Sequence, residues 1–227
     1  MAIVVVRPEP GNAATIAALR AQGMAARPLP FFAARAVDWT PPEPDAFDAL
    51  LITSAQAVRL AGPGLEGLRA KPVIAVGPAT AAAARQAGLT VILTGARDAA
   101  AVVEEARGLG LDRLLHLAGQ DRVETGAMTR IVYAAEPIPI DSPAVHALAG
   151  AIVLLHSARA AERLGELVDR AGMPRSSVAI VAISAKTARA AGTGWRGVTV
   201  ATAPRDDAML AAARALTRTA ATGISGA

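Results

Sequence analysis

The chain contains no cysteine, which excludes disulfide bonds, thiolate metal sites and cysteine nucleophiles together. Aromatic residues are scarce: one tyrosine, two tryptophans and three phenylalanines among 227 residues. Only Lys71 and Lys186 are lysines, so the formal charge of +4 comes from arginines scattered along the chain. Nucleic-acid-binding proteins usually show a basic cluster with aromatic stacking residues, so we expect no nucleic-acid partner. Most of the arginines are expected on a solvated surface, but their excess also suits a small ligand rich in carboxylates.

Long apolar runs are also missing. The apolar run at the start of MAIVVVRPEP ends at once in Arg-Pro, which does not fit a signal peptide. No stretch approaches the roughly 20 apolar residues of a membrane span. With 53% apolar and 19% charged residues, the composition is that of a folded protein with a sizeable core. We therefore expect a cytoplasmic protein without a membrane partner.

Short apolar runs alternate with alanine-rich stretches along the whole chain. Runs of this length predict strands buried on both faces of a parallel sheet. The stretches between them, such as 12–22, 79–87 and 99–107, have helix composition and end near glycine. The alternation predicts an α/β fold. The predicted strands are Ile3–Val6, Ala49–Ile52, Val73–Val76, Val91–Leu93, Leu114–Leu117, Ile131–Tyr133, Ile152–Leu155, Val178–Ile183 and Val198–Ala201.

This α/β pattern occurs twice. LLITSAQAVRLAG (50–62) matches VLLHSARAAERLG (153–165), which places Ser54 opposite Ser157. VIAVGPATAAAARQAG (73–88) matches AIVAISAKTARAAGTG (179–194), and TVILTGARDAA (90–100) matches VTVATAPRDDA (198–208). An internal repeat of this kind predicts two similar parallel-sheet α/β domains.

The two copies end differently, and the difference predicts how the domains are connected. The second copy lacks the strands that follow the first, while the chain start has the missing strand–helix–strand form. We therefore predict a discontinuous domain of residues 1–31 plus 138–219, an inserted domain of residues 32–137, and a tail of residues 220–227. Two strands must then cross between the domains as a two-stranded linker, with a ligand cleft between the domains.

Small polar residues and glycines follow the predicted strands. In parallel α/β sheets, ligands bind at the carboxyl ends of the strands, where free N–H groups of helix N-termini attract anions. A serine or threonine there either caps the next helix or contacts a ligand, and both alternatives stay open. The candidate binding residues are Ser54, Gly77, Thr80, Gly119, Ser157 and Thr187, together with the cations Arg7, Arg122 and Lys186.

Several motifs of cofactor and metal chemistry are missing. There is no Gly-x-Gly-x-x-Gly after the first strand and no Walker lysine, which speaks against dinucleotides and nucleoside triphosphates. The three histidines lack metal-ligand spacing, and no serine lies in a Gly-x-Ser-x-Gly turn. We expect no metal and no cofactor. His116 and His156 lie in apolar strand runs, which predicts core histidines with satisfied hydrogen bonds.

One ordered set of segments carries a family resemblance. The segments are VRPEPG (6–11), ALLITSAQAVR (49–59), PVIAVGPATAAAARQAG (72–88), LLHLAGQDR (114–122), IVYAAEP (131–137) and LLHSARAA (154–161). Together they resemble the uroporphyrinogen-III synthase family, from Ile3 to about Leu216. The resemblance implies a cofactor-free, monomeric lyase of tetrapyrrole (haem) biosynthesis. Such enzymes close linear hydroxymethylbilane, an octacarboxylate, to uroporphyrinogen III with loss of water and inversion of ring D through a spiro intermediate.

The resemblance also implies roles for single residues. Tyr133, in the Val-Tyr segment, would assist departure of the hydroxyl as a hydrogen-bond donor or general acid; the alternative is packing alone. Substrate contact is favoured for Thr187 more than for Thr80. Ser184 stands where the family usually has glycine, which puts close ligand approach there in doubt.

Other functions and partners remain open at this point. A two-domain small-ligand binding protein and a twin-domain glycosyltransferase are the alternatives from other classes. A transient contact with the preceding enzyme of the pathway is a further expectation.

Overall fold

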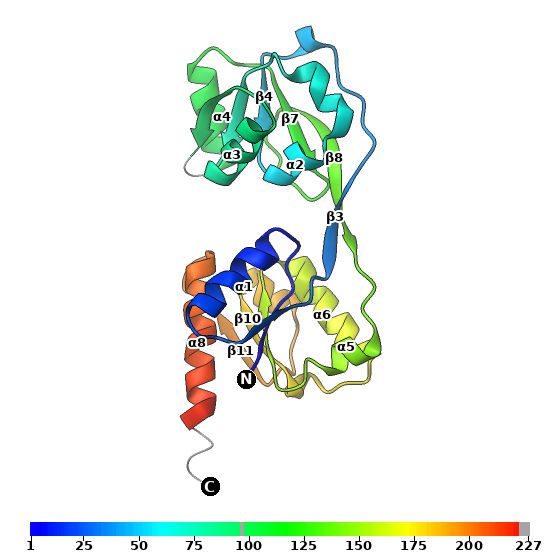
Figure 1. Cartoon of the computed structure of the whole chain (residues 1–227), viewed down its shortest axis with the longest axis vertical. Helices are drawn as coiled ribbons and strands as arrows, with labels where there is room; N and C mark the ends of the chain where they lie inside the picture. The colour runs from blue at the N-terminus through cyan, green and yellow to red at the C-terminus, as the bar shows by residue number, and fades with distance from the viewer. Residues whose placement is uncertain (96–97, 223–227) are drawn as a thin grey trace. The chain divides into compact units, whose positions relative to one another are not determined.

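The computed structural model describes residues 1–95 and 98–222 (Figure 1). Residues 96–97, inside the repeat segment 90–100, and residues 223–227 of the predicted tail lie outside the described residues. The chain divides into two compact units. Unit 1 comprises Met1–Ala33 and Pro137–Ala227, and unit 2 comprises Ala34–Glu136. Unit 1 is therefore discontinuous in sequence, and unit 2 is inserted into it.

Unit 1 is built on a sheet of five parallel strands in the order β11-β10-β9-β1-β2. The first strand of the chain lies inside this sheet, where Val5 is in register with Leu154 of β9 and Pro28 of β2. The elements of unit 1 are β1 (Ile3–Val5), α1 (Gly11–Ala21), β2 (Ala26–Pro28), α5 (Ser142–His146), β9 (Ile152–Leu155), α6 (Ala158–Arg170), a 3-10 turn (Arg175–Ser177), β10 (Ala179–Ala182), α7 (Ala185–Ala190), β11 (Gly197–Val200) and α8 (Asp206–Thr222).

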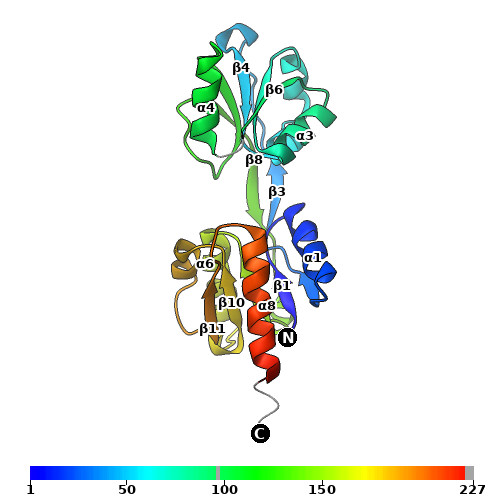
Figure 2. The same cartoon turned by 90° about the vertical axis from the view of Figure 1, so that its left-hand side faces the viewer.

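Helices cover both faces of this sheet, which explains why its inner strands are continuous apolar runs. Helices α1 and α8 pack on one face, where Leu19 and Met209 meet Ile3 and Leu154 in one buried cluster. Figure 2 shows α8 and α1 over the sheet, with α6 set apart from them. Helix α6 contacts its neighbours α5 and α7 and the strand β9.

Unit 2 contains most of a six-stranded sheet in the order β3-β8-β7-β4-β5-β6, in which the pairs among β4 to β8 are parallel. One buried cluster gathers Leu50, Ile52, Leu115 and Leu117, and a second on the other face includes Val102 of α4. The elements are β3 (Phe32–Ala36), 3-10 turns (Pro44–Ala46 and Gly62–Leu68), β4 (Ala49–Ile52), α2 (Ala55–Leu60), β5 (Val73–Val76), α3 (Pro78–Gln86), β6 (Val91–Gly95), α4 (Ala99–Gly108), β7 (Leu114–Gly119) and β8 (Met128–Pro137).

The connection from β7 to β8 is short for a parallel crossover. Leu115 of β7 is in register with Met128 of β8, so the chain returns along the sheet through residues 120–127. Parallel crossovers usually need about a dozen residues or more and contain a helix. Here a segment without regular secondary structure replaces the helix, and we call residues 120–127 the crossover segment.

The chain start has the predicted strand–helix–strand form. Its second strand, β2 (Ala26–Pro28), contains a proline and lies at the edge of its sheet, where proline is tolerated. One detail differs from the sequence predictions. The predicted tail began at residue 220, but α8 continues to Thr222.

Candidate functional site

The strand order reverses once in each sheet. In unit 1 the chain moves from β1 to β2 on one side and through β9, β10 and β11 on the other. In unit 2 it moves from β4 through β5 to β6 on one side and from β7 to β8 on the other. Open α/β sheets bind ligands at the carboxyl ends of the strands that flank such a reversal. Arg7 and Ser157 follow the two flanking strands of unit 1, while Ser54 and Gly119 lie at the corresponding ends in unit 2.

Gly119 and Tyr133 are in direct contact in unit 2. They are register partners on β7 and β8, and the Gln120 N–H donates to the Tyr133 carbonyl at 2.9 Å. A Cβ atom on Gly119 would lie 2.6 Å from Tyr133 Cζ and 2.8 Å from its hydroxyl oxygen, so a larger residue cannot fit without movement. Tyr133 is half-buried against the core of unit 2. The close strand approach thus holds the phenol over the carboxyl end of β7.

Ser54 and Ser157 cap helices in the same way. The Ser54 hydroxyl accepts from the Gln56 N–H, and the Ser157 hydroxyl accepts from the Ala160 N–H, each at 3.2 Å. Capping is therefore confirmed for both serines. It uses one acceptor lone pair of each hydroxyl and leaves its proton available.

Thr80 and Thr187 do not cap their helices. The N-cap residue of α3 is Gly77, which offers no side-chain cap, and helix α7 is capped by Ser184, whose hydroxyl accepts from the Thr187 N–H at 3.2 Å. Both threonines are buried, at 5% and 3% exposure. The capping alternative is thus wrong for these two side chains.

The two equivalent helix starts also differ in backbone. Gly77 has φ +91°, a conformation that favours glycine, whereas Ser184 has an extended backbone with φ −155°. The two copies of the repeat therefore differ both in this residue and in the geometry of the turn before the helix. Ser184 adopts an ordinary extended backbone and is not strained.

We expect replacement of Ser184 by alanine to lower the free energy of unfolding by about 1 kcal/mol, because the cap is lost. Ser184→Gly, which gives α7 the N-cap residue that α3 has at Gly77, should lose only a few tenths of a kcal/mol. Urea unfolding of both variants measures the difference. Equal losses would show that the hydroxyl does not stabilise the helix start.

Arg7 is the centre of a polar cluster in unit 1. Its Nη1 lies 2.7 Å from Asp206 Oδ2 and donates to Thr15 Oγ1 at 3.3 Å. The other side of the Arg7 guanidinium lies on Gly11, where a Cβ atom would come within 2.5 Å of Nε. The pKa of Asp206 is lowered to about 2, first by the adjacent His156 imidazole and then by Arg7 and Thr15, against the opposing effect of burial. Asp206 is therefore ionised near neutral pH.

The structure corrects the prediction for His156. Its side chain is only 8% exposed, but neither ring nitrogen has a hydrogen-bond partner, and Nε2 lies 3.5 Å from Asp206 Oδ1. It is buried without being satisfied.

The other predicted cations differ in how their charge is used. Arg122, in the crossover segment, pairs with Glu124 at 2.9 Å. Lys186 is the second residue of α7 and is exposed. Since Arg7 and Arg122 are both paired within their own units, the positive charge they offer a substrate is smaller than the sequence implies.

His116 is a core histidine with both ring nitrogens satisfied, as predicted. Nε2 lies 3.0 Å from Thr53 Oγ1, and Nδ1 lies 3.3 Å from Thr125 Oγ1 of the crossover segment. Burial, and then the charge of Arg122, lowers its pKa from 6.5 to about 4, while Glu124 opposes the shift. The neutral imidazole thus ties the crossover segment to the end of β4.

We expect the free energy of unfolding to fall by up to about 2 kcal/mol between pH 7 and pH 5 on account of His116. In this range the unfolded chain protonates the histidine and the folded chain does not, so lowering the pH favours unfolding. Urea unfolding at both pH values measures the loss. His116→Asn should remove this part of the pH dependence; an equal loss in the variant would contradict the assignment.

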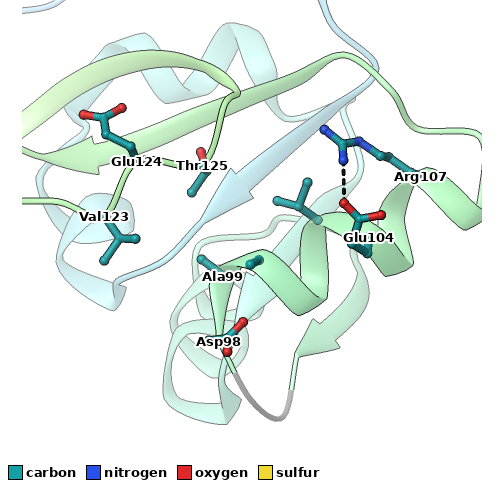
Figure 3. Close-up of a pocket in the computed structure, with 9 residues that line it drawn as sticks. Asp98, Ala99, Glu104, Arg107, Val123, Glu124 and Thr125 are labelled. Carbon is teal, nitrogen blue, oxygen red and sulfur yellow. Dashed lines mark hydrogen bonds and ion pairs between the residues drawn. The ribbon is translucent and has the colours of Figure 1, made fainter.

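A pocket of about 270 Å³ in unit 2 lies apart from the predicted site residues. Figure 3 shows that its lining comes from α4, with Glu104 and Arg107 paired along the helix, and from Val123, Glu124 and Thr125 of the crossover segment. Its surface is largely apolar, and none of the ten candidate residues lines it. We therefore place the candidate site at the strand reversals.

The described part of the chain holds neither a membrane-spanning helix nor a cluster of metal-binding side chains. No helix within it is long and apolar enough to cross a membrane. In residues 1–95 and 98–222, no group of three or more histidine, aspartate or glutamate side chains is arranged to hold a metal ion.

Sequence reasoning missed Asp206 and His156 as parts of one cluster with Arg7. The repeat places Asp206 opposite Asp98, but nothing local indicates that it reaches a residue 199 positions away. The structure brings together Arg7, Asp206 and His156 in unit 1, and Gly119 with Tyr133 in unit 2.

The chain has two parallel α/β units, each with polar residues at its strand reversal. This arrangement is typical of α/β proteins that bind small molecules. Within that class, a family model described as uroporphyrinogen-III synthase HemD matches residues 13–211. The chain belongs to this family and is a cyclising lyase of tetrapyrrole biosynthesis. Neither the binding protein nor the glycosyltransferase is favoured.

A solved structure supports this fold. The chain is similar to uroporphyrinogen-III synthetase from Helicobacter pylori 26695, with 19% identity, a TM-score of 0.63 and coverage of 94% of this chain and 98% of that one. Uroporphyrinogen III synthase from the extremely thermophilic bacterium Thermus thermophilus shares 16% identity over 99% of each chain, with a TM-score of 0.40. A search of curated protein sequences gave no significant match.

Proposed function

We propose that the chain binds hydroxymethylbilane in a cleft between its two units, at the carboxyl ends of both sheets. The two segments that connect the units would then act as a two-stranded linker. Substrate carboxylates would meet Arg7, Ser157, Lys186 and Thr187 on unit 1 and Ser54, Gly77, Thr80 and Arg122 on unit 2. Closing the ring in one curled conformation is catalysis by proximity and orientation.

The contact between Gly119 and Tyr133 supports this proposal most directly. It holds the phenol hydroxyl at the strand reversal of unit 2. From there Tyr133 would donate a proton or hydrogen bond to the departing hydroxyl. The cleft would keep water from the reactive intermediate.

The test is to mix the purified protein with freshly prepared hydroxymethylbilane and to separate the cyclised isomers. We expect uroporphyrinogen III in excess over the isomer formed without enzyme. An isomer ratio equal to the protein-free control would overturn the proposal.

We further propose that the enzyme works as a monomer in the cytoplasm, with transient contact to the preceding pathway enzyme. Light scattering of the purified protein, cell fractionation and cross-linking to that enzyme test the three parts separately.

A further inference from the structure

Asp206 lies at the strand reversal of unit 1 and is held there by groups from three other elements. Arg7 Nη1, after β1, lies 2.7 Å from Oδ2, and the Thr15 hydroxyl of α1 donates to the same oxygen at 3.0 Å. His156, after β9, approaches Oδ1 with Nε2 at 3.5 Å. The Asp206 side chain nevertheless remains 44% exposed. The carboxylate is therefore fixed in position but still open to a ligand.

The buried imidazole of His156 is independent evidence that this cluster serves a ligand. Its side chain is more than nine-tenths buried, yet both ring nitrogens lack a hydrogen-bond partner among the described residues. Buried polar groups are normally satisfied, because an unsatisfied one loses its hydrogen bonds to water without replacement. Nε2 faces the Asp206 carboxylate at 3.5 Å, whereas Nδ1 has no partner among the described residues. A buried nitrogen without a partner, beside an open carboxylate, is typical of a functional site.

The repeat supplies a direct comparison. Asp98 occupies the position equivalent to Asp206 and caps its own helix, since its Oδ1 accepts from the Ala101 N–H at 2.9 Å. Asp206 instead directs both oxygens toward Arg7, Thr15 and His156. The same residue at the same helix start is thus used for capping in unit 2 and for the cluster in unit 1.

An ionised carboxylate at this place opposes binding of the ground-state substrate, which carries eight carboxylates. The reaction, however, creates a positive charge. The C–O bond of the hydroxymethyl group breaks with both electrons going to oxygen, which accepts a proton and leaves as water. The cation left on the carbon and its pyrrole is consumed when the terminal pyrrole forms the new C–C bond. In the spiro intermediate the old bond between the attacking pyrrole carbon and its methylene bridge then breaks, which leaves a second cation on the neighbouring pyrrole. The free α-carbon of the terminal pyrrole attacks this methylene carbon, and the proton is returned when that α-carbon loses its hydrogen and the ring regains its aromaticity.

We infer that Asp206 is a catalytic residue whose exposed carboxylate face contacts the substrate and stabilises this cation. The inference rests on the proposed function. A group that disfavours the anionic substrate and favours the cationic intermediate contributes to rate rather than to binding. Arg7, Thr15 and His156 are the positioning residues that hold it.

Steady-state kinetics of Asp206→Asn test the inference through the split between kcat and KM. We expect kcat to fall about 10- to 100-fold, with the lower value favoured because the carboxylate is partly screened by solvent. KM should stay unchanged or fall, because a repulsive charge is removed. Asp206→Glu should recover most of kcat. Asp207→Asn is the matched control: it removes the same charge from the next residue, which pairs with Arg205 at 3.2 Å, and should leave kcat unchanged.

An unchanged kcat in Asp206→Asn would overturn the inference. A lower melting temperature beside it would indicate that Asp206 only stabilises the fold, and a lower KM would indicate that Asp206 only repels the substrate. If this variant does not fold, Arg7→Gln/Asp206→Asn replaces the ion pair by a neutral amide pair; a wild-type kcat in this double variant would equally overturn it. Absence of product with the wild-type protein is a different result and would overturn the proposed function itself.

Discussion

Gly119→Ala is expected to lose about 100-fold in turnover and about 1–3 kcal/mol in the free energy of unfolding. The added methyl group would lie 2.6 Å from Tyr133 Cζ, and the phenol is its nearest neighbour. Gly119 of β7 and Tyr133 of β8 are register partners. The Tyr133 ring must therefore tilt away from the added methyl group, or the two strands must separate. Either movement displaces the Tyr133 hydroxyl from its position at the end of β7, and turnover falls when a catalytic group is misplaced.

The control for this variant is Gly108→Ala. Gly108 ends α4, and a Cβ atom there would have no neighbour within 4 Å, so both activity and stability should be preserved. Combining Gly119→Ala with Tyr133→Leu removes the colliding ring and should recover stability without recovering turnover. If the double variant were as unstable as Gly119→Ala alone, the collision with Tyr133 would not explain the loss.

Tyr133→Phe should lower kcat by about 100-fold and leave the melting temperature almost unchanged, because only the hydroxyl is removed. The remaining ring still packs over Gly119 and on the core of unit 2. With slower enzymatic closure, more of the substrate should close spontaneously and raise the share of the wrong isomer. Rate and isomer ratio are measured in the same assay. Full turnover with an unchanged isomer ratio would show that Tyr133 only packs.

Much of the architecture could be predicted because strands and helices leave local signals. The continuous apolar runs became the inner strands, and the repeat in sequence corresponds to two sheets with the same kind of reversal. Strand β2 could be predicted only from the repeat, because Ala26–Pro28 is short, only partly buried and ends in proline. Such a strand depends on pairing with β1 rather than on its own composition.

The site was less predictable because it depends on contacts between distant residues. Arg7 was predicted as a substrate-binding cation, but the sequence did not show its ion pair with Asp206, which lies near the other end of the chain. The repeat aligned Thr80 with Thr187, but it did not show that Gly77 and Ser184 give the two turns different backbones. Local sequence indicates where a strand ends, whereas packing decides which group meets which at that end.

The position of β1 has a consequence for the order in which the protein folds during synthesis. β1 is made first, yet its partner β9 begins about 150 residues later, at Ile152. Unit 2, by contrast, is one continuous segment, and its strands β4 and β5 each pair with the next strand along the chain. Contacts between distant residues form more slowly than local ones. We therefore expect unit 2 to fold while the chain is still being synthesised. β1 can pair with β9 only after the last third of the chain has been translated.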